Sequence, residues 1–214
     1  MEKEHLLFDL DGTLTDPKEG ITKSVQYALN AFGIQAEDRE TLCRFIGPPL
    51  KDSFMEFYGF TEEEAIKGVA SYREYFREKG MLDNKVYDGV QQLLKSLVQR
   101  GKKLYVASSK PEVFVRKILE HFELDSYFVF AGGGDLEGTR DKKADVIRYV
   151  LKECQLADLS KIVMIGDRKH DILGAKEVGI DSVGVLYGYG SRQELEEAGA
   201  DWIAETIFDL QNLL

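Results

Sequence analysis

Short apolar runs recur along most of this chain, and longer amphipathic segments separate them. Apolar runs bounded by turn residues are typical of buried strands, and apolar residues at helical spacing are typical of helices packed on a core. The predicted strands are residues 6–10, 103–107, 127–131, 162–165 and 182–185, with a short one at 202–204. The predicted helices between them are residues 90–99, 112–122, 143–154, 172–178 and 193–198, before a last helix. This alternation predicts an α/β fold with a parallel sheet and helices on both faces.

The alternation stops between residues 17 and 88, where we find no convincing strand. Helical periodicity instead runs through residues 22–32, 50–58 and 62–79. Thr61 and the glutamates after it are typical of a helix N-cap with an acidic first turn. We therefore expect an all-helical subdomain over residues 17–86, inserted into a core of residues 1–16 and 87–214. Such an insertion would rest over the carboxyl edge of the sheet, where open α/β sheets bind ligands.

Composition narrows the possible partners. The 214 residues are 43% hydrophobic and 31% charged, which suits a globular protein of one large domain or a core domain with an insertion. The net charge of −10 would repel nucleic acid, so we expect no such partner. No apolar run suits a signal peptide or a membrane span, so we expect a cytoplasmic location and no membrane partner. The distant Cys43 and Cys154 exclude a zinc cluster and predict buried free thiols.

Two carboxylates mark the end of the first predicted strand. Asp9 and Asp11 lie two positions apart before Gly12, so their side chains point to the same side of the strand. Carboxylates beside an apolar strand are costly unless a cation or a hydrogen-bond network meets them. The alternative is a solvated strand end with an Asp-Gly turn.

A second acidic pair follows the strand predicted at residues 162–165. Asp167 and Asp171 lie four positions apart, and a helix that begins at Lys169 would bring them together. Asp171 alone could simply cap that helix. Two acidic strand ends in one parallel sheet can lie side by side and form a hard-oxygen cation site, which Mg²⁺ fits best. Zinc is not expected, because the three histidines have no ligand spacing.

Hydroxyls and lysines precede two of the predicted helices. The strand at residues 103–107 is followed by Ser108, Ser109 and Lys110, and a helix whose first turn holds Pro111 comes next. Backbone N–H groups and hydroxyls at a helix start bind phosphate readily, although this sequence is also a common helix start. The segment of residues 139–145 offers a further cation at the start of another helix, although a lysine there, such as Lys142, is usually solvated surface.

These segments together resemble the haloacid dehalogenase superfamily of phosphohydrolases over essentially the whole chain. The first motif matches at residues 9–14, the second at Ser108, the third at Lys143 and the fourth at Gly166-Asp167 with Asp171. Their order and spacing argue against chance. The resemblance implies a Rossmann-like core with a small helical cap domain as the insertion. Segments that resemble the phosphoglycolate phosphatase branch, near its 5′-nucleotidase-like members, are residues 15–17, 45–50 and 186–190.

The resemblance implies separate roles for the two carboxylates of the first strand. Asp9 is the nucleophile that forms an aspartyl-phosphate, and Asp11 is the general acid and base. Mg²⁺ is bound by Asp9, Asp167 and the backbone carbonyl of Asp11, while Asp171 orients metal waters or binds the ion weakly. Because the family's dehalogenases lack an acid/base Asp at this position, Asp11 argues against carbon–halogen chemistry.

The resemblance also implies which residues hold the substrate. Ser108 and Lys143 bind the phosphoryl oxygens, and Lys143 pairs with Asp9 as well. Further substrate-binding candidates are Gly12, Thr13, Ser109, Lys110, Phe45, Gly47 and Pro48. Residues 45–50 would face the site when the cap closes about hinges near residues 15–18 and 86–89, or they simply form a turn between cap helices. Ser109 departs from the branch, which often has Asn there.

The expected function is a Mg²⁺-dependent phosphomonoesterase for a small phosphorylated metabolite, such as a nucleoside monophosphate or a phosphoglycolate-like ester. A ring-bearing substrate could use Phe45 or Tyr58. A phosphosugar mutase of the same fold is one alternative, and a non-catalytic phosphate-binding module is another. The complete set of nucleophile and metal residues argues against the module. A chain of this size could be a monomer or a homodimer.

Overall fold

The computed structural model describes residues 2–36 and 38–214 and divides into two compact units. The larger unit comprises the chain up to Thr15 together with Val86–Leu214, and the smaller comprises Asp16–Lys85. The predicted subdomain, residues 17–86, is displaced from the smaller unit by one residue at each end.

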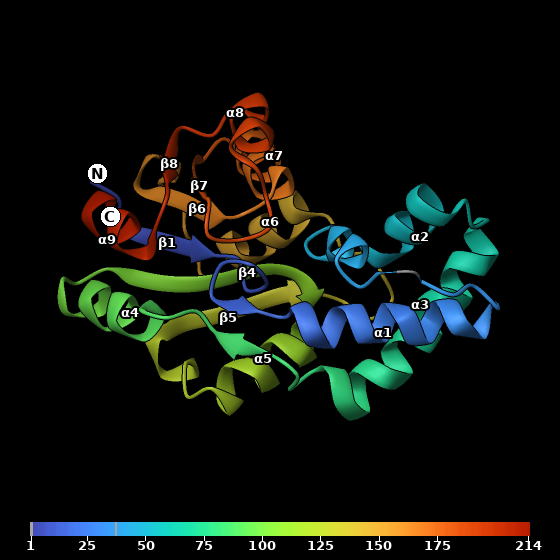
Figure 1. The fold of residues 1–214 in the computed structure, drawn as a ribbon. Coiled ribbons are helices and arrows are strands. Elements are labelled where there is room, and N and C mark those ends of the chain that lie inside the picture. The colour runs from blue at the N-terminus through green and yellow to red at the C-terminus, as the bar shows by residue number, and fades with distance from the viewer. Residues whose placement is uncertain (1, 37) are drawn as a thin grey trace. The chain divides into compact units, whose positions relative to one another are not determined.

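The larger unit is built on a parallel sheet, which has six strands in its described residues and the order β5-β4-β1-β6-β7-β8 (Figure 1). The strands are β1 (His5–Phe8), β4 (Lys103–Pro111), β5 (Phe128–Gly134), β6 (Ile162–Gly166), β7 (Asp181–Val185) and β8 (Trp202–Ala204). The predicted α/β fold is therefore confirmed. β1 ends before residue 10 because the chain turns there, and the N–H groups of Leu14 and Thr15 fold back onto the Leu10 carbonyl.

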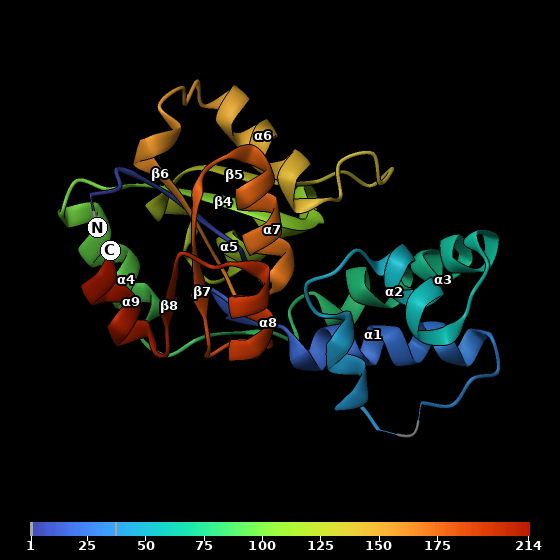
Figure 2. The same ribbon diagram turned by 90° about the horizontal axis from the view of Figure 1, so that it is seen from above.

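Helices cover both faces of this sheet, and Figure 2 shows them from above. One face carries α4 (Val90–Gln99), α5 (Glu112–His121) and α9 (Ile207–Leu213), and the other carries α6 (Lys143–Glu153), α7 (Lys169–Val178) and α8 (Arg192–Ala198). On the second face, Met164 of β6 belongs to a buried cluster with Ile147 and Val150 of α6. β1 lies between β4 and β6, and the strand order runs outward from it in both directions. The carboxyl ends of these three strands therefore form the switch point at which α/β sheets bind ligands.

The smaller unit is helical. It contains α1 (Lys18–Ala31), α2 (Leu50–Tyr58) and α3 (Glu62–Tyr75), a 3₁₀ turn at Thr41–Phe45 and a π-helical turn at Phe76–Gly80. The predicted cap at Thr61 is confirmed: its hydroxyl accepts from the Glu64 N–H at 3.3 Å, and the Glu64 carboxylate accepts from the Thr61 N–H at 2.8 Å. Phe54 and Phe60 stack with ring centroids 5.5 Å apart.

Three expectations need correction. We expected no strand between residues 17 and 88, but β3 (Lys85–Val86) pairs with β2 (Thr15–Asp16), and a two-residue strand is too short to show a period. Pro111 ends β4 rather than standing in the first turn of α5, because its ψ of 131° is extended. Cys43 and Cys154 are free but only half-buried; Cys154 caps the end of α6 at the rim of the core.

None of the helices among residues 2–36 and 38–214 has the length and apolar character needed to cross a membrane.

Candidate active site

Asp9 and Asp11 follow β1 at the carboxyl edge of the sheet. The Asp9 N–H donates to the Ile165 carbonyl of β6 at 2.9 Å, which continues the strand pairing by one residue. The two aspartates are only 4% and 6% exposed. The alternative of a solvated strand end is therefore wrong, and groups within the protein have to compensate these carboxylates.

Three carboxylates meet at this edge. Asp9, Asp167 and Asp171 each place a carboxylate oxygen within 4.8 Å of the other two, and all three residues are buried. α7 begins at Lys169, as predicted, and this brings Asp171 back toward Asp167. Asp171 also caps the helix, since its Oδ2 accepts from the Arg168 N–H at 3.1 Å. Asp171 therefore caps the helix and also lies in the carboxylate cluster, and its part in binding a cation stays a prediction.

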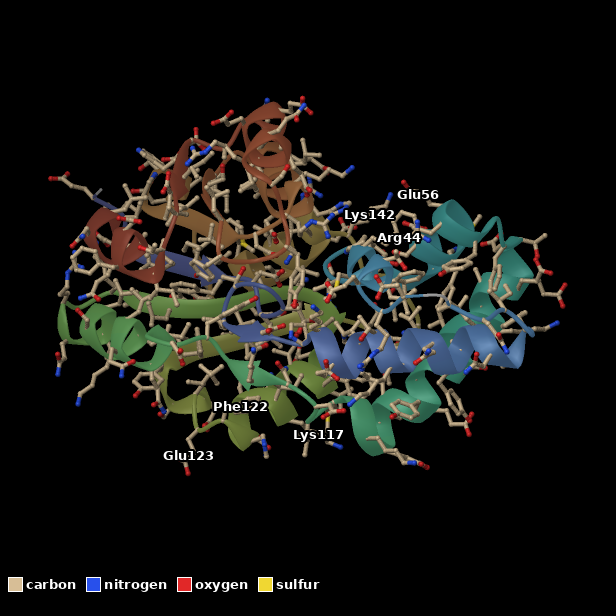
Figure 3. The ribbon with its side chains drawn as sticks, viewed as in Figure 1. Arg44, Glu56, Lys117, Phe122, Glu123 and Lys142 are labelled. Atoms are coloured by element: carbon tan, nitrogen blue, oxygen red, sulfur yellow. The ribbon has the colours of Figure 1, made fainter. Side chains whose placement is uncertain are left out.

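Lys143 supplies a positive charge to this cluster. Its ammonium Nζ lies 2.9 Å from Asp9 Oδ1 and 2.7 Å from Asp171 Oδ1, and it donates to the Ala107 carbonyl of β4 at 2.9 Å. Burial alone would lower the pKa of Lys143, but the Asp171 and Asp9 carboxylates outweigh burial and raise it above its usual value. Lys143 is therefore a buried permanent cation and not a surface lysine. Its neighbour Lys142 is exposed (Figure 3).

The ionised forms of Asp167 and Asp171 are unfavourable in this buried cluster unless a further cation binds there. Burial raises the pKa of Asp167 well above its usual value, and Asp171 and Asp9 add to the effect. Burial raises the pKa of Asp171 to about 6, against the opposing pull of Lys143. Asp167 Oδ2 accepts from the Tyr189 N–H at 2.7 Å, whereas Oδ1 has no hydrogen-bond partner within the described ranges. A buried unpartnered oxygen beside two more carboxylates is a donor set that fits Mg²⁺.

This cluster predicts how stability depends on pH when no metal is bound. Folding raises the pKa of Asp167 and Asp171, so the folded chain binds more protons than the unfolded chain from about pH 4 up through about pH 6. Stability from these groups therefore falls as pH rises through that range. At about pH 8 in EDTA, we expect Asp167→Asn to raise the free energy of unfolding by about 1–4 kcal/mol, because one buried charge disappears.

Urea unfolding of both proteins at about pH 8 and about pH 5 measures this difference. The difference in the free energy of unfolding between the variant and the wild type should be smaller at the lower pH, where the wild-type carboxyls take up protons. Mg²⁺ should stabilise the wild type and not the variant. A variant less stable than the wild type at the higher pH in EDTA would contradict the prediction.

Asp11 has a different partner. The Lys110 Nζ lies 2.8 Å from both Oδ1 and Oδ2 of Asp11, and both side chains are less than a tenth exposed. Burial raises the pKa of Asp11, and the Lys110 charge opposes that rise. From the sequence we expected Lys110 to contact the substrate. In the structure its ammonium contacts the Asp11 carboxylate, and a substrate contact stays a prediction. No spacing along the chain signals this pair, which forms because β1 and β4 are neighbours.

Three predicted substrate-binding residues of the larger unit carry buried hydroxyl groups. Ser108 lies in β4 and is 2% exposed. The hydroxyls of Thr13 and Ser109 are buried, and neither has a hydrogen-bond partner in the part of the chain that the structure describes. Buried hydroxyls usually have partners, so the lack of one at both positions is unusual. Gly12 lies in the same turn as Thr13, and their substrate contacts stay a prediction.

Two basic residues within the fourth motif, Arg168 and Lys169, have a structural role. Arg168 Nε lies 2.9 Å from Glu194 Oε1, and the backbone N–H of Lys169 donates to the same oxygen at 2.8 Å. Glu194 therefore joins the start of α7 to α8. Both residues therefore belong to the structure of the helix start.

The predicted substrate residues Phe45, Gly47 and Pro48 belong to the smaller unit. Phe45 is 2% exposed, and its ring contacts Phe54 and Phe57 with centroids 5.1 and 5.3 Å apart. The Arg44 guanidinium, labelled in Figure 3, lies 4.4 Å above the Phe57 ring. This burial favours a packing role for the Phe45 ring, and the part of these three residues in binding stays a prediction.

The fold and the acidic strand ends define a hydrolase of the α/β class with a centre suited to phosphoryl groups. Residues 6–185 match the haloacid dehalogenase-like hydrolase family, and the chain belongs to that family.

The relatives include proteins named as phosphatases, and also the tyrosine-protein kinase PtkA of Mycobacterium tuberculosis, which is 37% identical over 98% of this chain and 72% of the relative. The chain is 52% identical to a 5′-nucleotidase from Pseudomonas aeruginosa over 191 residues, which cover 89% of this chain and 86% of the relative. It is 30% identical to a phosphoglycolate phosphatase from Colwellia psychrerythraea, over 98% of this chain and 96% of the relative. The structure of a predicted phosphatase from Clostridium acetobutylicum superimposes with a TM-score of 0.97 at 50% identity, over 100% and 98% of the two chains. The protein is therefore a phosphatase.

Proposed function

We propose that this protein is a Mg²⁺-dependent phosphomonoesterase that hydrolyses a small phosphorylated metabolite through an aspartyl-phosphate on Asp9. The observation that carries the proposal is the contact of Lys143 with Asp9 and Asp171 inside a buried cluster of three carboxylates. Such a cluster is costly to fold and is retained where phosphoryl chemistry needs both a nucleophile and cations.

Asp9 is the nucleophile in this proposal. A carboxylate oxygen forms a bond to phosphorus while the bond from phosphorus to the ester oxygen breaks, which divides one difficult displacement into two easier ones. Lys143 stays cationic and lies against Asp9, so it holds the nucleophile in place and attracts the phosphoryl oxygens. Bound by Asp9, Asp167 and the Asp11 carbonyl, Mg²⁺ would supply positive charge that offsets the charge of the transferring group.

Asp11 moves the protons. Burial raises its pKa, which favours a carboxyl group that gives a proton to the departing alkoxide. The ionised Asp11 then takes a proton from the water that attacks phosphorus and releases phosphate from Asp9. Lys110 stabilises this ionised form between the two steps, because its ammonium contacts both oxygens of Asp11.

Hydroxyl donors orient the phosphoryl group. Ser108 takes one oxygen with Lys143, and the unpartnered hydroxyls of Thr13 and Ser109 offer two more donors.

The substrate is a nucleoside monophosphate or a phosphoglycolate-like ester in this proposal. The names of the 5′-nucleotidase and phosphoglycolate phosphatase relatives support these two classes. Substrate choice would lie in the smaller unit, with Phe45, Gly47 and Pro48 as the candidate contacts.

A kinetic panel of nucleoside monophosphates, phosphoglycolate and sugar phosphates tests the proposed function. We expect Mg²⁺-dependent release of inorganic phosphate from one of the first two classes, and loss of that release in EDTA. Sugar phosphates are included because an isomerised sugar phosphate without release of free phosphate would identify the protein as a mutase and not a phosphatase. Failure to release phosphate from any compound, with Mg²⁺ present, would contradict an enzymatic role.

A further inference from the structure

The segment of residues 186–190 follows β7 and packs on the acidic cluster without contributing an acidic side chain to it. The sequence singles it out as a Tyr-Gly-Tyr-Gly stretch, but none of its residues has a role in the reaction proposed above. A main-chain N–H group of the segment contacts the cluster, and one of its hydroxyls contacts the turn after β1.

A backbone group of this segment fixes one oxygen of Asp167. The Tyr189 N–H donates to Asp167 Oδ2 at 2.7 Å, while Oδ1 of the same carboxylate has no hydrogen-bond partner in the described sequence. Asp167 is fully buried, so one donor sets which of its two oxygens remains available. The remaining oxygen belongs to the residue that meets Asp9 and Asp171 in the cluster.

Two glycines let the segment come close enough to make this contact. A Cβ on Gly188 would overlap the Gly12 carbonyl oxygen and the side chain of Asp167. A Cβ on Gly190 would overlap the backbone carbonyl oxygen of Asp167. At both positions the obstructing atoms include main-chain oxygen, so an added side chain has to displace the segment or the aspartate.

A hydroxyl ties the same segment to the turn after β1. The Tyr187 hydroxyl donates to the Thr13 carbonyl at 3.2 Å, and the Tyr187 ring meets the edge of Tyr87 with centroids 5.4 Å apart. The segment therefore contacts both acidic strand ends, which come from opposite halves of the chain.

We propose that residues 186–190 position the cation site: the Tyr189 N–H holds Asp167 Oδ2 and leaves Oδ1 available to bind Mg²⁺, and Tyr187 fixes the segment to the turn that carries Asp11. This inference rests on the proposed function, since it concerns the Mg²⁺ that the phosphatase would use. Groups that orient metal ligands by hydrogen bonds typically change metal affinity about 10–100-fold when they are disturbed.

Calorimetric titration of the full-length, metal-free protein with Mg²⁺ tests the proposal without recourse to activity. Gly188→Ala should raise the Kd for Mg²⁺ about 10–100-fold. Gly101→Ala is the matched control: it makes the same chemical change at a strained φ of +82°, but nothing lies within 4 Å of the added carbon. The control should lose some stability and keep the wild-type Kd.

Each outcome has one meaning. If the wild type itself binds no Mg²⁺, the proposed Mg²⁺-dependent function is overturned, because the protein then has no cation site. If the wild type binds and a folded Gly188→Ala binds within about twofold of it, the positioning role is overturned while the phosphatase proposal stands. If Gly188→Ala does not fold, Tyr187→Phe decides, because it removes a single hydroxyl. An increase in Kd of about threefold or more supports the role, and an unchanged Kd overturns it.

Discussion

Asp9→Asn should abolish phosphate release from an aryl phosphate, with kcat lowered at least about 10⁴-fold. An amide has no anionic oxygen with which to attack phosphorus, and loss of a nucleophile is among the largest single effects in enzymes of this kind. The substitution keeps the shape of the side chain and leaves Lys143 its contact with Asp171. The protein should therefore fold, which circular dichroism and thermal unfolding will show.

The matched control for this experiment is Asp125→Asn, which makes the same change at an exposed aspartate. It should keep the wild-type kcat. Acid-quenched wild-type protein should carry one phosphoryl group by mass spectrometry, and Asp9→Asn should carry none. Mg²⁺-dependent turnover that persists in Asp9→Asn would end the aspartyl-phosphate proposal.

Lys143→Met should have the largest effect on stability. Removal of the ammonium leaves Asp9 and Asp171 buried beside one another without their common cation, and an uncompensated buried pair of this kind costs about 3–5 kcal/mol. The loss should be greatest at about pH 8 in EDTA and smaller at about pH 5, since burial raises the pKa of Asp171 to about 6 and its protonation removes part of the unpaired charge. We also expect kcat to fall at least about 10²-fold, because a donor to the transition state is lost.

Lys142→Met provides the control for this variant at the adjacent position. Lys142 is exposed, so its replacement should change the free energy of unfolding by less than about 0.5 kcal/mol. Urea unfolding with and without Mg²⁺ measures both variants. Equal stability of Lys143→Met and Lys142→Met in EDTA would show that the Lys143 ion pairs contribute nothing to folding.

Much of the larger unit is predictable because its central strands β4, β1, β6 and β7 are buried on both faces. Such parallel strands appear in the sequence as continuous apolar runs with amphipathic helices between them. The strand predicted at residues 162–165, for example, is β6, which ends one residue later. The two acidic strand ends follow from the same rule, since parallel strands end together at one edge. Asp9, Asp167 and Asp171 could therefore be placed together before any distance was known.

Other contacts leave no trace in the sequence. The Lys110–Asp11 pair depends on which strands become neighbours, and a lysine before a helix looks the same whether it meets a carboxylate or solvent. The Tyr189 contact with Asp167 is made by a backbone N–H group, which every residue except proline possesses. Phe45 shows a related ambiguity, because an aromatic side chain in a loop suits either a ligand or a small core.

The position of β1 between β4 and β6 has a consequence for the order in which a growing chain can assemble. His5 of β1 pairs with both Lys103 of β4 and Ile162 of β6. The first strand to be synthesised therefore cannot pair until two strands much later in the chain have been synthesised. Lys143 leaves the ribosome before Asp167 and Asp171. A sheet of β1, β4 and β5 could therefore pack against α6 first, and Lys143 of that helix would neutralise Asp9. Long-range closure of this kind slows folding, and a chain interrupted before β6 would hold one acidic strand end with its lysine and lack the second.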